Sequence, residues 1–144
     1  MDRNGYLGMV AELRGQLRLV ERVYDRLQDR AQVGLDTASK RDSVAYQVHN
    51  LYCAAEDLLK LVARVFENQI GTGGDWHRVI LLRLSEAIEG IRPALLSEET
   101  FGVMNALRGF RHFVRHVYGA EIEVTQLKVN LELAIRLKEL LLRM

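Results

Sequence analysis

The chain has 144 residues, 49% hydrophobic and 27% charged, which is typical of a single globular domain over residues 1–144 and excludes a disordered protein. Its net charge is only +1, so any binding of nucleic acid must come from a local cluster of basic residues and not from overall basicity. No apolar stretch reaches the roughly 18 residues of a membrane span, and Cys53 has no second cysteine, so we expect a cytoplasmic protein without membrane segments or an intrachain disulfide.

Two long amphipathic helices are predicted in the first half of the chain. Apolar residues recur at alternating steps of three and four over residues 10–31, which predicts one helix stripe, and Gly34 interrupts it. The same pattern returns over residues 44–65. Ser39 followed by Asp42 resembles a capping box, so we expect the second helix to begin there.

Three shorter helices are predicted in the second half. Asp75 follows a glycine-rich turn and can cap a third helix, which Pro93 stops. Ser97, followed by two glutamates, opens a fourth helix that Gly119 ends, and a fifth runs from about Val124 to the last residue. With short connections and a single proline, these elements predict an all-α, antiparallel bundle of about five helices.

The most informative stretch is NALRGFRHFVRHVY, residues 105–118. On a helix of about 100° per residue, its apolar residues fall within one arc. The opposite arc holds three arginines, two histidines and no carboxylate, namely Arg108, Arg111, His112, Arg115 and His116. A solvated helix face usually mixes both signs of charge, so this face is suited to an anion. Two plainer interpretations stay open: a basic solvent face, or arginines paired with glutamates of a neighbouring helix.

The residue types of this arc suit phosphoryl chemistry. Arginine offers a planar fork for phosphate, and histidine exchanges protons near neutral pH. Arg111, His116 and Tyr118 form the pattern R-x4-H-x-Y, which resembles the signature of HepT-like toxins of the HEPN superfamily. The glycine-rich turn before Asp75-Trp76-His77 and the late position of the motif are also similar to that family.

The resemblance implies a function and its partners. HepT-like toxins are homodimers whose motif helices line a composite cleft, and they cleave RNA, with tRNA a plausible substrate. They form type VII toxin–antitoxin systems with a cognate minimal nucleotidyltransferase (MntA-like) antitoxin, which transfers AMP from ATP onto the motif tyrosine, here Tyr118. AMPylation blocks the ribonuclease centre.

Roles for the motif residues follow from the same resemblance. Arg111 would hold the scissile phosphate, and His116 would act as general acid or base, with no metal and no cofactor. Arg108, His112 and Arg115 would bind the RNA, and His112 is a second candidate for proton transfer. Residues five apart on a helix point about 140° from each other. We therefore expect Arg111 and His116 to meet across a homodimer.

Other interpretations remain. His112 and His116 have the i,i+4 spacing of paired metal ligands, but a third ligand (His49, His77, Cys53 or Glu56) has no recognised spacing, and three arginines would repel a cation. His49 is interpreted as surface or core filler and Cys53 as a small buried hydrophobe. The chain could instead be a non-catalytic HEPN-type substrate- or nucleotide-binding partner of a nucleotidyltransferase, or a plain helical dimerisation module.

Overall fold

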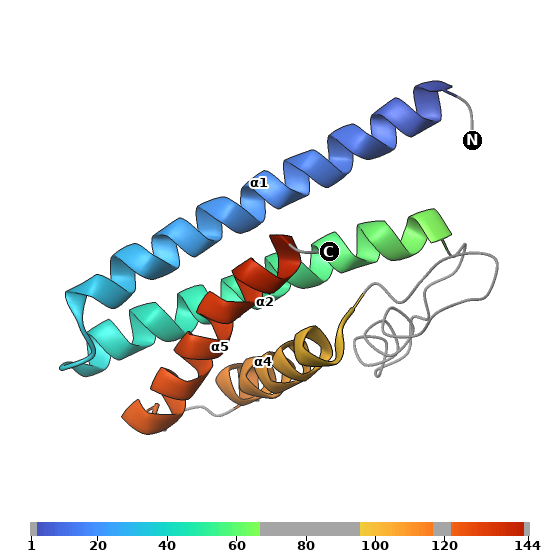
Figure 1. Ribbon diagram of the computed structural model, residues 1–144. Coiled ribbons are helices and arrows are strands. Elements are labelled where there is room, and N and C mark those ends of the chain that lie inside the picture. Colours follow the sequence, from blue (N-terminus) through green and yellow to red (C-terminus); the bar gives the residue numbers. More distant parts are fainter. Residues whose placement is uncertain (1–2, 67–95, 117–121, 143–144) are drawn as a thin grey trace.

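The computed structural model describes residues 3–66, 96–116 and 122–142, and within them every regular element is a helix (Figure 1). The four described helices are α1 (Arg3–Val33), α2 (Ala38–Phe66), α4 (Glu98–His116) and α5 (Val124–Leu142). The all-α helical bundle is therefore confirmed. The predicted third helix, with its capping Asp75 and its stop at Pro93, lies outside the described residues.

The turn between α1 and α2 makes these two helices an antiparallel pair. Gly34 takes a φ of +108°, a backbone conformation that residues with a side chain rarely adopt, and its N–H donates to the carbonyl of Ala31 (3.2 Å). The N-cap of α2 is Thr37, whose Oγ1 accepts the backbone N–H of Lys40 (3.2 Å). The predicted start at Ser39 was thus wrong by two residues, because two hydroxyl residues near each other could both cap the helix.

The second helix, α2, is the centre of the described bundle, because it packs against α1, α4 and α5. Figure 1 shows α1 and α2 extending together beyond the other two described helices. The largest fully buried side chains come from all four helices: Leu27, Leu51, Tyr52, Leu59, Met104, Leu107, Leu127 and Leu137. Polar contacts add to this core, since Gln16 donates from α1 to the carbonyl of Ala54 (2.9 Å) and Lys138 of α5 lies over the Tyr24 ring (4.2 Å).

The start and the orientation of α4 are well defined. Ser97 caps the helix as predicted, since its Oγ accepts the backbone N–H of Thr100 (3.1 Å). Arg136 of α5 binds both carboxylate oxygens of Glu99 (2.7 and 3.1 Å) and also Glu139 (2.6 Å). This forked contact joins the first turn of α4 to α5.

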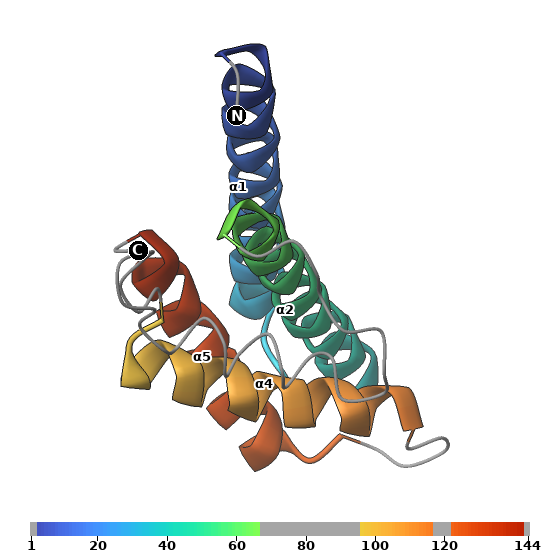
Figure 2. The ribbon, with the colours of Figure 1, turned by 90° about the vertical axis from the view of Figure 1, so that its right-hand side faces the viewer.

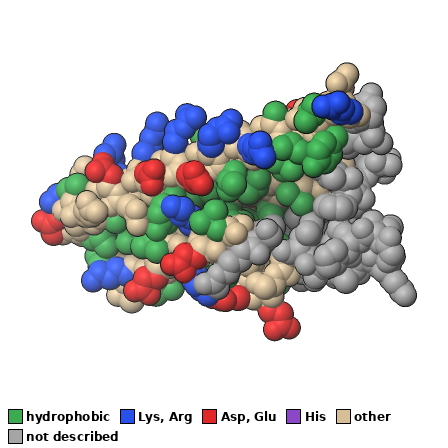
Figure 3. Space-filling model, turned by 45° about the horizontal axis from the view of Figure 1, so that its top comes forward, with side chains coloured by type: hydrophobic (Ala, Val, Ile, Leu, Met, Phe, Trp, Pro, Cys, Tyr) green, Lys and Arg blue, Asp and Glu red, His purple; other side chains and the backbone are tan. Residues whose placement is uncertain are grey.

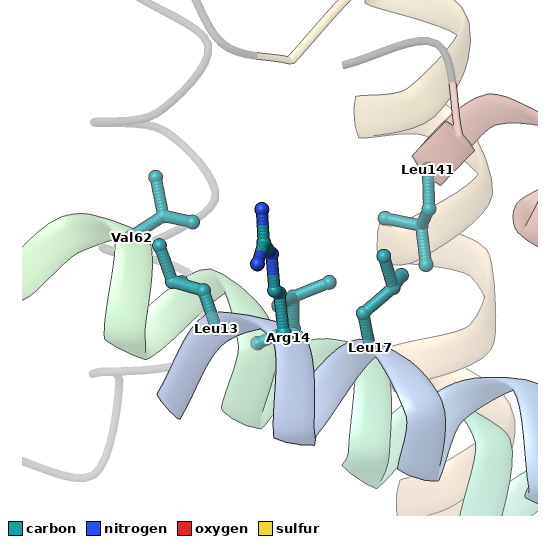
Figure 4. A pocket seen from close by; sticks show the side chains of 6 residues that line it. Leu13, Arg14, Leu17, Val62 and Leu141 are labelled. Atoms are coloured by element: carbon teal, nitrogen blue, oxygen red, sulfur yellow. The ribbon is translucent and has the colours of Figure 1, made fainter. Parts of the chain in front are cut away.

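An open apolar hollow of about 200 Å³ lies where α1, α2 and α5 meet (Figure 4). It is lined by Leu13, Arg14, Leu17, Leu58, Val62 and Leu141. No residue of α4 contributes to its wall, so it is separate from the basic motif. In the part of the chain that is described, no helix is long and apolar enough to cross a membrane.

Candidate functional site

The apolar face of α4 packs against the hydrophobic core as predicted. Val103, Leu107 and Phe110 are buried, and Val114 is half-buried against the same core. These residues lie three or four apart, so they form one stripe on the helix. The next predicted member, Val117, lies outside the described residues.

The opposite face of α4 carries the predicted basic residues. His112, Arg115 and His116 are exposed, whereas Arg108 and Arg111 are partly buried. The Arg108 guanidinium donates two hydrogen bonds to Asn105 Oδ1 (3.3 and 3.1 Å). Among the residues that the structure describes, no carboxylate forms an ion pair with any of the three arginines. Their positive charge is therefore not balanced by an ion pair in those segments.

The two histidines form a stack at the end of α4. The ring centroids of His112 and His116 are 4.2 Å apart, and the ring planes differ by 24°. The Nδ1 of His116 donates to the backbone carbonyl of His112 (2.9 Å). A carbonyl only accepts hydrogen bonds, so Nδ1 must carry a proton. The remaining nitrogen, Nε2, is then the atom of His116 that can exchange a proton with a ligand.

Arg111 faces the neighbouring helix and not His116. Its positive charge affects the pKa values of His49, Tyr52 and Cys53, which all belong to α2. Its Nε is buried and has no hydrogen-bond partner among the described groups. His116, in contrast, is exposed. Within one chain the two motif residues therefore point to different sides of α4, in agreement with the angle expected from their spacing.

A polar stripe on α2, which sequence reasoning missed, lies opposite these arginines. It consists of His49, Tyr52, Cys53 and Glu56, spaced three, one and three residues apart, and so lies on one side of the helix. The Tyr52 hydroxyl donates to Glu56 Oε2 (2.6 Å), and both residues are buried. Burial, followed by the bond to Glu56, raises the pKa of Tyr52. The spacing of these polar residues within an apolar helix was the available signal.

His49 and Cys53 are in contact within this stripe. The Nε2 of His49 lies 3.7 Å from the Cys53 sulfur. Burial, and then the charges of Arg111 and Arg115, lower the pKa of His49. Burial raises the pKa of the Cys53 thiol, against a smaller opposite effect of Arg111. Both side chains are half-buried: His49 is a polar residue between helices, and Cys53 packs against the hydrophobic core as expected, although it is only partly buried.

The geometry of the two stacked histidines, His112 and His116, does not resemble a metal site. Their rings stack, and Nδ1 of His116 is engaged by a carbonyl. In the described segments, no three His, Cys, Asp or Glu side chains gather closely enough to hold a metal ion. The possible ligand His77 lies outside those segments, as do Trp76 and the motif residue Tyr118.

The comparisons with known proteins agree with the motif. A family model described as HepT-like protein matches residues 43–143, which include all three motif residues, most of α2, and α4 and α5. The comparisons with curated proteins and with solved structures gave no match. The match covers well over half of the chain and leaves out α1. The chain belongs to the HepT-like proteins of the HEPN superfamily.

Proposed function

We propose that this protein is the toxin of a type VII toxin–antitoxin system and cleaves RNA without a metal ion. The observation that carries the proposal is the basic face of α4, whose arginines have no carboxylate partner among the described residues. This face lies within the region that matches the HepT-like family. A row of guanidinium and imidazole groups suits a ribose-phosphate backbone.

The proposed reaction is an attack of the ribose 2′-oxygen on the neighbouring phosphorus. A bond forms between the 2′-oxygen and phosphorus, and the bond from phosphorus to the 5′-oxygen breaks, which leaves a 2′,3′-cyclic phosphate and a 5′-hydroxyl. Arg111 binds the phosphate and stabilises the charge that develops on it. One imidazole takes the 2′-hydroxyl proton, and a second gives a proton to the 5′-oxygen.

His116 is suited to proton transfer because its Nδ1 is already engaged. The bond to the His112 carbonyl orients the ring and leaves Nε2 for the substrate. One histidine cannot both accept and give a proton in a single step. A homodimer provides a second His116, and His112 is an alternative because its ring lies 4.2 Å away.

A homodimer would also allow Arg111 and His116, which point in different directions within one chain, to act on the same phosphate. Arg111 is partly buried, whereas His116 is exposed, so one chain does not aim both at a single phosphate. If two α4 helices face each other across a twofold axis, the exposed His116 of one copy can approach the arginine side of the other. The edge position of α4, on the side of α2 away from α1, is compatible with this pairing (Figures 1 and 2).

The proposed regulator is a nucleotidyltransferase antitoxin that attaches AMP to Tyr118. This tyrosine is two residues beyond His116 in the sequence. The attached AMP would add bulk and a negative phosphate beside the basic face. Arg111 or Arg115 could bind that phosphate in place of RNA. We further propose that the pair acts in the cytoplasm.

The direct test is RNA cleavage by the purified full-length protein. We expect tRNA, incubated with the protein and EDTA, to be cut and to yield a 2′,3′-cyclic phosphate. Cleavage should be lost in His116→Ala and in Arg111→Ala, and on a substrate with 2′-deoxyribose at the scissile position. Arg22→Ala, which removes an exposed arginine of α1, is the matched control and should cleave normally. Cleavage that persists in His116→Ala overturns the proposal.

A non-catalytic role is the second candidate, and one observation favours it. Because Arg111 is partly buried whereas His116 is exposed, the basic face could serve only to bind a nucleotide or an RNA beside a nucleotidyltransferase. In that case the wild type binds RNA or ATP without cutting RNA. His116→Ala then changes binding alone.

A further inference from the structure

We propose that the side chain of His112 is a positioning residue, which holds the His116 ring in place by stacking on it and carries no proton in the reaction. The inference rests on the proposed role of His116 in RNA cleavage. It also selects between the two sources of the second proton, because it leaves that task to the His116 of a second copy. The R-x4-H-x-Y motif assigns no role to the residue at position 112.

Two contacts hold the His116 ring, and each restricts a different motion. The hydrogen bond from Nδ1 to the His112 carbonyl (2.9 Å) holds one edge of the ring, but a single hydrogen bond tolerates a tilt of tens of degrees. The His112 ring covers one face, with the centroids 4.2 Å apart and an interplanar angle of 24°. In the part of the chain that the structure describes, His116 has no other hydrogen bond, ion pair or ring contact. The stack is thus the contact that sets the ring plane there.

The two contacts come from different parts of His112, and this separates their functions. The carbonyl belongs to the backbone and is present whatever side chain stands at position 112. The tautomer of His116 therefore does not need the imidazole of His112, whereas the plane of the His116 ring does. For this reason the side chain can be replaced while the hydrogen bond to Nδ1 is kept.

The stack also places His112 poorly for proton transfer. In the proposed reaction the attacking and leaving oxygens lie roughly in line through phosphorus, so the groups that accept and give the protons stand on opposite sides of the phosphate. Two rings whose centroids are 4.2 Å apart have no space between them for a phosphate. Both imidazoles of one chain therefore approach the phosphate from the same side, and the second proton carrier comes from elsewhere.

The position of His116 explains why its ring needs a support. His116 is the last residue of α4, and both rings are exposed, so no packed side chains surround them. A displacement of about 1 Å in a group that acts in the transition state can lower a rate roughly a hundredfold. An aromatic ring one helical turn earlier is a neighbour that the helix itself supplies. Loss of this ring should lower kcat and leave KM almost unchanged, because Arg108 and Arg115 would still bind the RNA backbone.

Three substitutions separate the possible roles of the side chain. His112→Phe keeps a flat ring that can stack but has no nitrogen for a proton or a hydrogen bond. His112→Gln keeps hydrogen-bonding groups without an aromatic ring, and His112→Ala removes both. Positioning by the ring requires that only His112→Phe functions. Proton transfer requires that none of the three does, and a hydrogen bond to RNA requires that only His112→Gln does.

The first test measures the His116 ring itself and needs no activity. In the full-length protein with isotope-labelled histidine, NMR should show the proton of the neutral His116 ring on Nδ1. The order parameter of this ring should fall in His112→Ala and His112→Gln and stay near the wild-type value in His112→Phe. Gly102→Ala is the control on the same helix, because nothing lies within 4 Å of its new β-carbon. A proton on Nε2, or a ring that stays equally ordered in His112→Ala, overturns the inference.

The second test measures RNA cleavage. His112→Ala and His112→Gln should each lower kcat at least about tenfold and change KM less than about twofold, whereas His112→Phe should restore most of the lost kcat. If His112→Phe is as inactive as His112→Ala, the inference is wrong. A higher KM with an unchanged kcat in His112→Ala means that the ring binds RNA, which also overturns it. If the wild type cuts no RNA at all, the proposed function fails, and the NMR measurement still decides whether the stack holds the His116 ring.

Discussion

The outer face of α1 and the basic face of α4 both carry arginines, but only α1 pairs them with acids along the chain. On α1, five exposed arginines follow one another at four-residue steps, at positions 14, 18, 22, 26 and 30. Glu21, Asp25 and Asp29 directly precede three of them, and Figure 3 shows basic and acidic side chains side by side over this part of the molecule. On α4 the three arginines between positions 108 and 115 have no acidic neighbour in the sequence.

The comparison teaches that the number of arginines does not by itself identify a site for an anion. The acids of α1 offset part of the charge of its arginines, and physiological salt screens what remains beyond about 8 Å, so the field of α1 on an approaching polyanion is weakened. In the described segments, no carboxylate forms an ion pair with an arginine of α4. The family match points the same way, because it includes α4 and begins after α1.

The largest expected effect comes from reversing charge on the two faces in turn. Changing Arg108 and Arg115 to Glu should weaken RNA binding about a hundredfold, or roughly tenfold for each lost charged contact with phosphate. The same double change at Arg18 and Arg22 should alter the affinity less than about threefold, since each already has an acidic neighbour three residues on. Fluorescence anisotropy with labelled tRNA measures both. If both double changes lowered the RNA affinity equally, the arginines of α1 and α4 would not differ in RNA binding.

The converse experiment is to make α1 resemble α4. Replacing Glu21 with Gln, and Asp25 and Asp29 with Asn, should raise RNA affinity several-fold and steepen its dependence on salt, because each additional phosphate contact adds about 0.7 to the slope for a single strand. Cleavage of a dinucleotide too short to reach α1 should not change. An affinity that stays constant would show that the acids do not mask the arginines of α1.

A smaller effect is expected from stiffening α4. Gly109 is exposed, and nothing lies within 4 Å of the position that a β-carbon would occupy. Gly109→Ala should therefore stabilise the fold by up to about 1 kcal/mol, or several degrees in Tm, without weakening RNA binding. Gly8→Ala on α1 meets equally open space and is the matched control. Differential scanning calorimetry measures both, and a lower Tm in Gly109→Ala would contradict the described surroundings.

The smallest expected effect is on how the stability of the folded protein depends on pH. The pKa of His49 is lowered by burial and by Arg111 and Arg115, so the folded protein prefers the neutral ring. Below its usual pKa of about 6.5 the unfolded chain binds a proton more readily than the folded chain, and stability falls as pH decreases. We expect Tm to fall more between pH 7.5 and 5.5 in the wild type than in His49→Gln. An equal fall would mean that His49 does not contribute.

The features that were predicted correctly depend on residues close together in the sequence. The stripe of Val103, Leu107 and Phe110 and the cap at Ser97 are local properties of one helix, and the structure confirms them. The N-cap of α2 was placed at Ser39, because Thr37 and Ser39 are chemically similar caps. Sequence patterns do not separate such neighbours well.

The part of the site that sequence reasoning missed depends on how two helices are aligned. Whether His49 and Cys53 face solvent or an arginine is decided by the register of α2 against α4, which no local pattern contains. The partial burial of Arg111 likewise depends on how α4 packs against its neighbours. Spacing alone predicted that Arg111 and His116 diverge, but it could not say what either would meet.

The hydrogen bond from His116 to the carbonyl of His112 makes the final turn of α4 part of the chemistry. The peptide backbone has the orienting role that a carboxylate has in many other proton-transferring histidines. The tautomer of this imidazole consequently depends on the winding of the helix end. A partner that unwinds this turn would inactivate the imidazole while leaving every residue of the motif intact.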